Sequence, residues 1–476
     1  MFRSLLQTRS TSAINSSYAR VTSWRALSFA LLGLSGVLVA VGCSSPAVRN
    51  AEGKATSAAS GGSGAGGGSQ INNSAGGAFV STGAGGRMGT ASGGASNANS
   101  GGATAAGGGG TVINTGWWDP AWARRRVITV QGPQAEALVN FPVPVKLGAD
   151  FDFASAKSMG EDIRFTDASG TPLDSEIESW SATEAVVWVR VPSLPPMGQS
   201  VELRMYYGNP AATALPASAT QGVWSADSYI GVWHFADGKD SGAGKYDGKA
   251  MTGAGDGGME NGAGTEFVAA KVGKGLLLRQ AVQSHFDLPQ AAVKLGGAPA
   301  MSFSGWWQAH PSTVDSAGAI IALAGNGAIG GVPGGHAAFE IDQEGEGLYV
   351  VANPVWVKDM PFIHEFRLNN GKVVNDVWTH IVVVVDLVSS TTVVYQDGVQ
   401  VEMQTGIDYM TMKFPDGLLA DGGYFGCDPT VNGAFANATM DEFRLQKVPR
   451  SAEWVKAEFA SMTSPTFAVV GGLETH

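Results

Sequence analysis

The chain has 476 residues, of which 67 are glycine and only 15% are charged. Its 41 acidic and 30 basic residues give a formal net charge of −11 at pH 7. Nucleic acids and anionic membrane surfaces both need a basic footprint on their protein partners, so this charge argues against either as the ligand.

The chain begins with the features of an export signal. Arg9, Arg20 and Arg25 precede an apolar run over residues 26–41. A basic region followed by an apolar region predicts a secretory signal peptide over residues 1–42. The run is shorter than the roughly 20 apolar residues that a membrane-spanning helix needs.

The end of that run resembles a bacterial lipobox. It reads Ala40-Val41-Gly42-Cys43, with alanine where the motif usually has leucine. The resemblance implies that Cys43 is acylated and becomes the mature N-terminus; an ordinary cleaved signal and an uncleaved anchor are the alternatives. Ser44 follows in place of the aspartate that retains lipoproteins in the inner membrane, which implies an outer-membrane lipoprotein facing the cell surface or the periplasm. Cys427 would then lack a cysteine partner, and we expect it to be a small buried residue.

Residues 43–115 are predicted to form a disordered tether. They consist mostly of Gly, Ser, Ala, Thr and Asn. Such a segment has too few apolar side chains to offset the entropy lost on ordering. We expect it to hold the folded part of the chain away from the membrane.

The rest of the chain has the patterns of an all-β protein. Apolar residues alternate over 201–207, and Val382-Val383-Val384-Val385 is typical of a strand buried on both sides. Asp397-Gly398 predicts a tight hairpin turn. The clearest helix candidate is Ser451–Met462, with Ser451 as its N-cap. Many short strands and little helix predict β-sandwiches.

Residues 116–227 contain a set of motifs that identify the first domain. The set is Trp117-Trp118-Asp119-Pro120-Ala121-Trp122, Phe141-Pro142-Val143, Asp162-Ile163-Arg164-Phe165, Glu176-Ile177-Glu178-Ser179-Trp180, Val187-Trp188-Val189-Arg190-Val191-Pro192 and Met205-Tyr206-Tyr207-Gly208-Asn209. It resembles the bacterial domain-of-unknown-function family 2341. The resemblance implies an extracytoplasmic β-domain that often precedes a lectin-like module, and it implies no activity.

Residues 228–447 contain a second set of motifs. The set is Gly231-Val232-Trp233-His234-Phe235, Asp240-Ser241-Gly242, Asn375-Asp376-Val377-Trp378-Thr379-His380-Ile381-Val382, Val394-Tyr395-Gln396-Asp397-Gly398 and Met440-Asp441-Glu442-Phe443-Arg444-Leu445. It resembles the laminin G-like branch of the concanavalin A-like lectin/glucanase fold. The resemblance implies a jelly-roll sandwich that binds carbohydrate or protein, often with a structural Ca²⁺, although some relatives are glycosidases. Residues 448–476 are expected to form a C-terminal helix and tail.

Asp441 and Asp240 are the predicted metal ligands. Strand alternation places Asp441 on the face of Phe443 and Leu445, where an ionised carboxylate is costly unless it is paired or bound to metal. Asp240 lies in a glycine-rich loop of the kind that supplies oxygen ligands to calcium. We expect the two to share a structural Ca²⁺; the alternative is that Asp441 accepts backbone N–H groups at a strand end.

Exposed aromatic residues are the predicted carbohydrate contacts. Trp356 lies in an expected loop, as does Tyr424, and Trp306 is adjacent to Trp307 in a strand, so that one of the two rings faces away from the core side of the other. Trp356, Trp306 and Tyr424 are therefore the candidate ligand-binding residues. Most tryptophans in a sandwich are instead expected in its core.

Charged residues elsewhere are interpreted as structural. Glu176 and Glu178 are two apart on a strand, and we expect them on one solvated face because catalytic carboxylates normally face each other across a cleft. His234 and His380 are expected to be satisfied histidines in strands. No catalytic residue is predicted.

Together these features predict a lipid-anchored recognition protein that is not an enzyme and that binds a polysaccharide or other glycan. A structural or adhesion protein that binds envelope proteins is the first alternative. A glycan-cleaving enzyme of the concanavalin A-like fold is the second.

Overall fold

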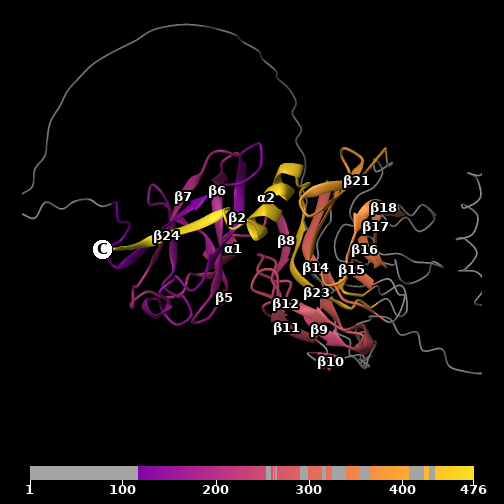
Figure 1. The fold of residues 1–476 in the computed structure, drawn as a ribbon, viewed down its shortest axis with the longest axis horizontal. Coiled ribbons are helices and arrows are strands. Elements are labelled where there is room, and N and C mark those ends of the chain that lie inside the picture. The colour runs from indigo at the N-terminus through magenta and orange to yellow at the C-terminus, as the bar shows by residue number, and fades with distance from the viewer. Residues whose placement is uncertain are drawn as a thin grey trace, which may run out of the picture. The chain divides into compact units, whose positions relative to one another are not determined.

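A computed structural model describes residues 116–253, 259–260, 262, 265–289, 298–312, 318–323, 339–352, 365–406, 423–427 and 435–476. From Ala121 onward the described residues belong to one compact unit. Antiparallel β-strands dominate it, as the sequence predicts, and they form two β-sandwiches (Figure 1). No helix in the described part of the chain has the length and hydropathy to cross a membrane.

The first sandwich contains a five-stranded sheet in the order β24-β1-β7-β3-β4 and a three-stranded sheet in the order β2-β6-β5. Its strands are β1 (Arg124–Val130), β2 (Leu138–Leu147), β3 (Arg164–Asp167), β4 (Pro172–Leu173), β5 (Ser175–Trp180), β6 (Ala185–Leu194), β7 (Val201–Tyr207) and β24 (Ala468–Thr475). Leu203 and Met205 of β7 pack against Val187 and Val189 of β6 in the core between the sheets. The alternation over 201–207 is therefore confirmed.

The second sandwich pairs a sheet in the order β10-β9-β13-β22-β15-β16-β17-β18 with a sheet in the order β11-β12-β23-β14-β19-β20-β21, and β8 also pairs with β23. The strands of the first of these sheets are β9 (Lys249–Thr252), β10 (Met259–Glu260), β13 (His285–Leu288), β15 (Gly318–Leu323), β16 (Phe339–Glu344), β17 (Gly347–Ala352), β18 (Glu365–Lys372) and β22 (Gly423–Phe425). Those of the second are β8 (Tyr229–Trp233), β11 (Thr265–Ala269), β12 (Lys274–Leu278), β14 (Ala300–Ala309), β19 (Thr379–Asp386), β20 (Thr391–Gln396), β21 (Val399–Thr405) and β23 (Ala438–Gln446). The core between these sheets contains Phe286 and Phe425 from one side and Phe303 and Phe443 from the other.

Local predictions in the second sandwich are confirmed. Asp397 and Gly398 have φ of 51° and 79° and join β20 to β21 in a tight hairpin. The valine run 382–385 lies in β19, between β14 and β20. Val383 and Val385 enter the core, while Val382 and Val384 pack against Val455 of a helix. One of the two buried sides of β19 therefore faces a helix, and the other faces the core between the sheets.

That helix, α2 (Ala452–Thr463), contacts both sandwiches. Its Trp454 ring lies 4.8 Å from the ring of Phe141 in β2, and its Val455 covers β19. After α2 the chain pairs β24 with β1, so that the expected C-terminal tail forms an edge strand of the first sandwich (Figure 1). The other α-helix of the described residues is α1 (Ala217–Gly222).

The N-cap of α2 offers a test of this local structure. The Ser451 side chain accepts a hydrogen bond from the Trp454 backbone N–H at 3.2 Å, as the sequence predicts. Replacing Ser451 with Ala should lower the free energy of unfolding by about 1 kcal/mol, whereas Ser451→Gly should cost only a few tenths, because glycine tolerates the cap backbone and leaves it hydrated. Denaturant unfolding of the full chain measures both. Equal losses for the two variants would contradict a capping role.

Candidate functional site

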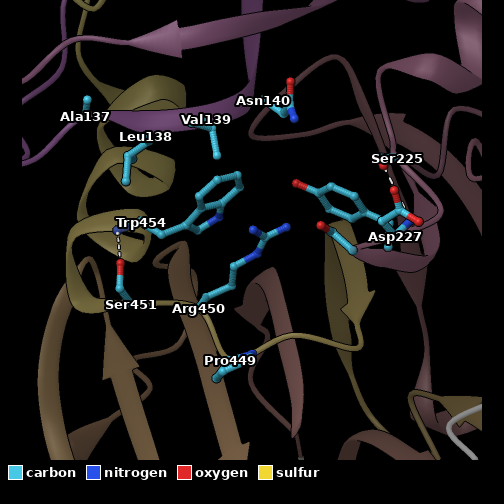
Figure 2. A pocket seen from close by; sticks show the side chains of 12 residues that line it. Ala137, Leu138, Val139, Asn140, Ser225, Asp227, Pro449, Arg450, Ser451 and Trp454 are labelled. Carbon is cyan, nitrogen blue, oxygen red and sulfur yellow. Dashed lines mark hydrogen bonds between the residues drawn. The ribbon is translucent and has the colours of Figure 1, made fainter. Parts of the chain in front are cut away.

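A surface pocket of about 330 Å³ lies where β2, the turn before β8 and the start of α2 meet (Figure 2). Its volume is at the small end of the range for small-molecule sites. The residues that line it are Ala137, Leu138, Val139, Asn140, Ser225, Asp227, Ser228, Tyr229, Pro449, Arg450, Ser451 and Trp454.

The pocket combines aromatic rings with a cationic side chain. The Arg450 guanidinium lies 3.6 Å from the centre of the Trp454 ring and 5.2 Å from that of Tyr229. Its Nε donates to the Gln446 side chain, and the guanidinium also interacts with the Tyr229 hydroxyl. These contacts fix a positive charge in the wall of the pocket, and such a charge attracts an oxygen of a ligand.

The opposite part of the pocket is polar. Asn140 and Asp227 are exposed, and Figure 2 shows them, with Ser225, on the side of the Trp454 ring away from Leu138. Asn140 has a φ of 54°, a conformation that asparagine adopts more readily than most residues. The pocket therefore has an apolar wall, a cation and several neutral or acidic hydrogen-bonding groups.

A second polar site is buried between the two sandwiches and α2. Arg444 of β23 forms ion pairs with Glu442 at 2.6 Å and with Glu458 of α2 at 3.0 Å. The three side chains are exposed by 3% or less. The Arg444 guanidinium also lies 4.7 Å from the Trp188 ring and 5.1 Å from the Trp224 ring. Residues of both sandwiches thus surround one buried cation.

His234, which follows β8, lies among three glutamates of this site. Its Nδ1 is 2.5 Å from Glu442 and 3.9 Å from Glu178, and its Nε2 is 3.6 Å from Glu176. The Trp188 indole N–H donates to Glu178 at 2.8 Å, and the Trp224 indole donates to Glu176. The prediction that Glu176 and Glu178 lie on a solvated face is therefore wrong: side-chain exposures are 16% and 0% because the second sandwich covers β5.

The charges shift one another's pKa values. Burial alone would lower the pKa of His234, but Glu442 and Glu176 raise it well above the usual value. Burial, reinforced by Glu442, raises the pKa of Glu178 to about 8. Burial would also raise the pKa of Glu458, but Arg444 and His380 hold it at about 2.

Asp441 does not lie where strand alternation predicts. Glu442 has a φ of 55°, and the pairing of β23 with β14 shifts between Ser304 and Trp306. This bulge inserts one residue, so that Phe443 still faces the core while Asp441 faces the buried charges. Burial and then Glu442 raise the pKa of Asp441 well above its usual value.

The two predicted calcium ligands both accept backbone N–H groups. Asp240 is 1% exposed, and its carboxylate accepts from the backbones of Val232, Gly242 and Tyr246 at 2.7–2.8 Å. Asp441 accepts from the Val272 backbone at 2.7 Å. These contacts organise loops, and the shared Ca²⁺ stays a prediction.

The predicted aromatic contacts lie elsewhere than at the surface pocket. Trp306 is 1% exposed and Tyr424 is 3% exposed, so neither ring offers a face to solvent. Trp306 packs near His380 and α2, and Tyr424 packs with Cys427. Cys427 is buried as expected, but it is disulfide-bonded, which corrects the expectation that it lacks a cysteine partner. The expectation of ligand contact is corrected for both rings, because sheet packing buries them. Trp356 and Cys43 lie outside the described residues.

Sequence reasoning missed most of the residues that form these sites. The sequence places Trp454 in the C-terminal helix and Arg450 just before it, and it predicts a pocket at neither residue. It also predicts that His234 and His380 lie in strands with their hydrogen-bonding groups satisfied. In the structure the His234 Nδ1 pairs with Glu442 at 2.5 Å and the His380 Nε2 lies 3.8 Å from Glu458, so both histidines have carboxylate partners and belong to the buried charge cluster. A usable signal was the run Asp441-Glu442-Phe443-Arg444, since three charges in one core strand require buried partners.

Comparisons with family models find the two families that the motifs resemble, in the same order. Residues 159–240 match the domain of unknown function DUF2341, and residues 281–456 match the concanavalin A-like lectin/glucanases superfamily. The order of these matches confirms the resemblances seen in the motifs. No curated protein matches the chain.

Among solved structures, the binding domain of botulinum neurotoxin serotype G is 11% identical, with a TM-score of 0.35 over 50% of this chain and 51% of that one. The serotype D binding domain is 12% identical, with a TM-score of 0.34 over 49% and 50%. The binding domain of Paraclostridial Mosquitocidal Protein 1 is 11% identical, with a TM-score of 0.32 over 45% and 51%. The chain spans about half the length of each of these structures.

The buried charges make Arg444 the most sensitive polar position. Replacing Arg444 with Leu should lower the free energy of unfolding by about 3–5 kcal/mol, because it leaves Glu442 and Glu458 buried without their cation. Denaturant unfolding of the full chain measures this loss. The matched control is Arg204→Leu, since the Arg204–Glu202 pair is 21% and 41% exposed and should contribute at most about 1 kcal/mol. Similar losses for the two variants would refute the contribution assigned to Arg444.

Proposed function

We propose that this chain is a non-catalytic recognition protein that carries lipid on Cys43 outside the cytoplasm and binds carbohydrate. The match of residues 281–456 to a lectin/glucanase superfamily supports a binding role. The observation that carries the proposal is the pocket around Trp454, with the Arg450 guanidinium in its wall.

The pocket has the two kinds of surface that a sugar ring requires. Leu138, Val139 and the edge of Trp454 provide apolar contact for the C–H groups of the ring. Arg450 provides a positive charge that favours an electronegative oxygen of a hydroxyl or carboxylate, and Asn140 and Asp227 provide polar groups at the rim. A few placed polar groups in a mainly apolar pocket are the usual source of orientation and specificity.

The same pocket supports binding rather than cleavage. Asp227 is the one carboxylate among its lining residues. Glycoside hydrolysis normally uses two carboxyl groups roughly 5–9.5 Å apart on either side of the scissile bond. Glycan cleavage is therefore the weaker alternative for this site.

Substitutions at the rim test carbohydrate recognition. The full chain should be retained on at least one member of a panel of immobilised neutral and acidic polysaccharides. Asp227→Ala and Asn140→Gly should each weaken that retention about tenfold or more, because each removes a polar contact of 1–2 kcal/mol or more. Glycine at position 140 keeps the left-handed backbone accessible. Affinity chromatography or surface plasmon resonance measures the change.

The control for these variants is Glu346→Ala. It removes a carboxylate of the second sandwich that is 69% exposed and does not line the pocket. It should leave retention unchanged. Unchanged binding by both rim variants, or no binding to any polysaccharide in the panel, would contradict this pocket as a glycan site.

The lipid anchor is tested separately. Cells fed radiolabelled palmitate should label the wild-type chain, and Cys43→Ala should abolish the label, since Cys43 is the residue that carries the lipid. The wild-type chain should fractionate with outer membranes, and the variant should leave them. An unlabelled wild-type chain would contradict the anchor without bearing on the pocket, and it is the result expected if the Cys43 thiol is the partner of the disulfide-bonded Cys427.

A further inference from the structure

We propose that the buried cluster Glu178, His234 and Glu442 is a binding site for a divalent transition metal, with Zn²⁺ as the ion it suits best. One ligand atom of each residue lies within 4.8 Å of the other two. The three come from β5, the segment after β8, and β23, so such an ion would bridge the two sandwiches.

The spacing of these atoms suits a small ion. Bonds of 2.0–2.2 Å in a tetrahedral zinc site place neighbouring ligand atoms roughly 3.3 Å apart. The His234 Nδ1 is 2.5 Å from Glu442 and 3.9 Å from Glu178, so the observed distances bracket that value. The three ligand atoms lie within 4.8 Å of one another, so side-chain movements of about an ångström or two would bring them to the required spacing.

Two further oxygens near this group are buried without a hydrogen-bond partner, the Glu178 Oε1 and the Asp441 Oδ1. The Glu178 Oε1 faces Gly273, since a Cβ there would lie 1.9 Å from it, and the carboxylate turns its Oε2 toward His234. Asp441 is not one of the three ligand residues, but its carboxylate interacts with the same buried charges, so a side-chain rotation would make it the fourth ligand.

The charge balance also favours a cation. Arg444 already pairs with Glu442 and Glu458. Among the described residues, no lysine or arginine forms an ion pair with Glu178 or Asp441; Glu178 shares His234 with Glu442. Lys146 interacts electrostatically with both carboxyl groups and Lys271 with Asp441, but neither lysine forms an ion pair with them, so a metal ion would add a positive charge in direct contact.

The donor set distinguishes among metals. An imidazole with two or three carboxylates suits zinc, whereas calcium takes six to eight oxygen ligands. A cavity of about 250 Å³ in the first sandwich lies next to the cluster, since Glu176 lines it and is also 3.6 Å from the His234 Nε2.

The test uses the full chain after dialysis against a chelator. Isothermal titration should show one tight Zn²⁺ site per chain, and Zn²⁺ should raise the melting temperature. Co²⁺ in place of Zn²⁺ should give the visible absorption of a four-coordinate site, and excess Ca²⁺ should not displace it.

Two variants identify the ligands. Glu178→Gln and Asp441→Asn resemble the protonated carboxyl groups, so both should fold in chelator with wild-type circular dichroism. Each should weaken Zn²⁺ at least tenfold, since loss of a ligand costs no less than the 10–100-fold loss of an outer-shell partner. His310→Asn is the matched control, because His310 also pairs with a carboxylate, Asp376, at 2.8 Å, and it should bind Zn²⁺ as the wild type does.

Three results would overturn the proposal: no stoichiometric Zn²⁺ binding by the stripped wild-type chain, a cobalt spectrum of an octahedral aqua type, or unchanged Zn²⁺ affinity in Glu178→Gln. If that variant does not fold, Asp441→Asn and the wild-type cobalt spectrum still decide. None of these measurements depends on carbohydrate binding.

Discussion

The structure depends on the burial of one guanidinium, that of Arg444, between two β-sandwiches and a helix. Glu442 on its own strand and Glu458 on α2 pair with it, and the Trp188 ring of the first sandwich covers it. Removing a charge from water is costly, and only good geometry to every partner offsets that cost. The positions of β23, α2 and β6 are therefore interdependent.

The path of the chain reinforces this dependence. After β23 the chain turns through Arg450 into α2, crosses to the first sandwich and ends in β24, which pairs with β1. The two domains are thus not structurally independent, because β24, which follows the second domain in the chain, forms the edge strand of a sheet in the first domain. The Trp454 pocket exists for the same reason, since β2, the turn before β8 and α2 each supply part of its wall.

The sequence predicts what local periodicity and turn chemistry control. The two sandwiches, the Asp397-Gly398 hairpin and the Ser451 cap all follow from residues close together in the chain. The position of Asp441 could not be predicted in this way, because a single bulged residue at Glu442 reverses the faces of the strand. The burial of Glu178 depends on contacts with a domain about 50 residues later in the chain, and no pattern within its own strand reports that.

A charged contact between domains has a consequence that an apolar contact would lack. Apolar residues of similar volume would often be as stabilising as buried ion pairs. An apolar contact, however, would tolerate a small displacement of one sandwich along the other. Displacing the sandwiches here would separate Glu458 from Arg444, and an uncompensated buried charge costs several kcal/mol. The Trp454 pocket is built from both sides of this contact, so its shape is held by the same electrostatics. Recognition at the surface of this protein is thereby tied to charge pairing in its interior.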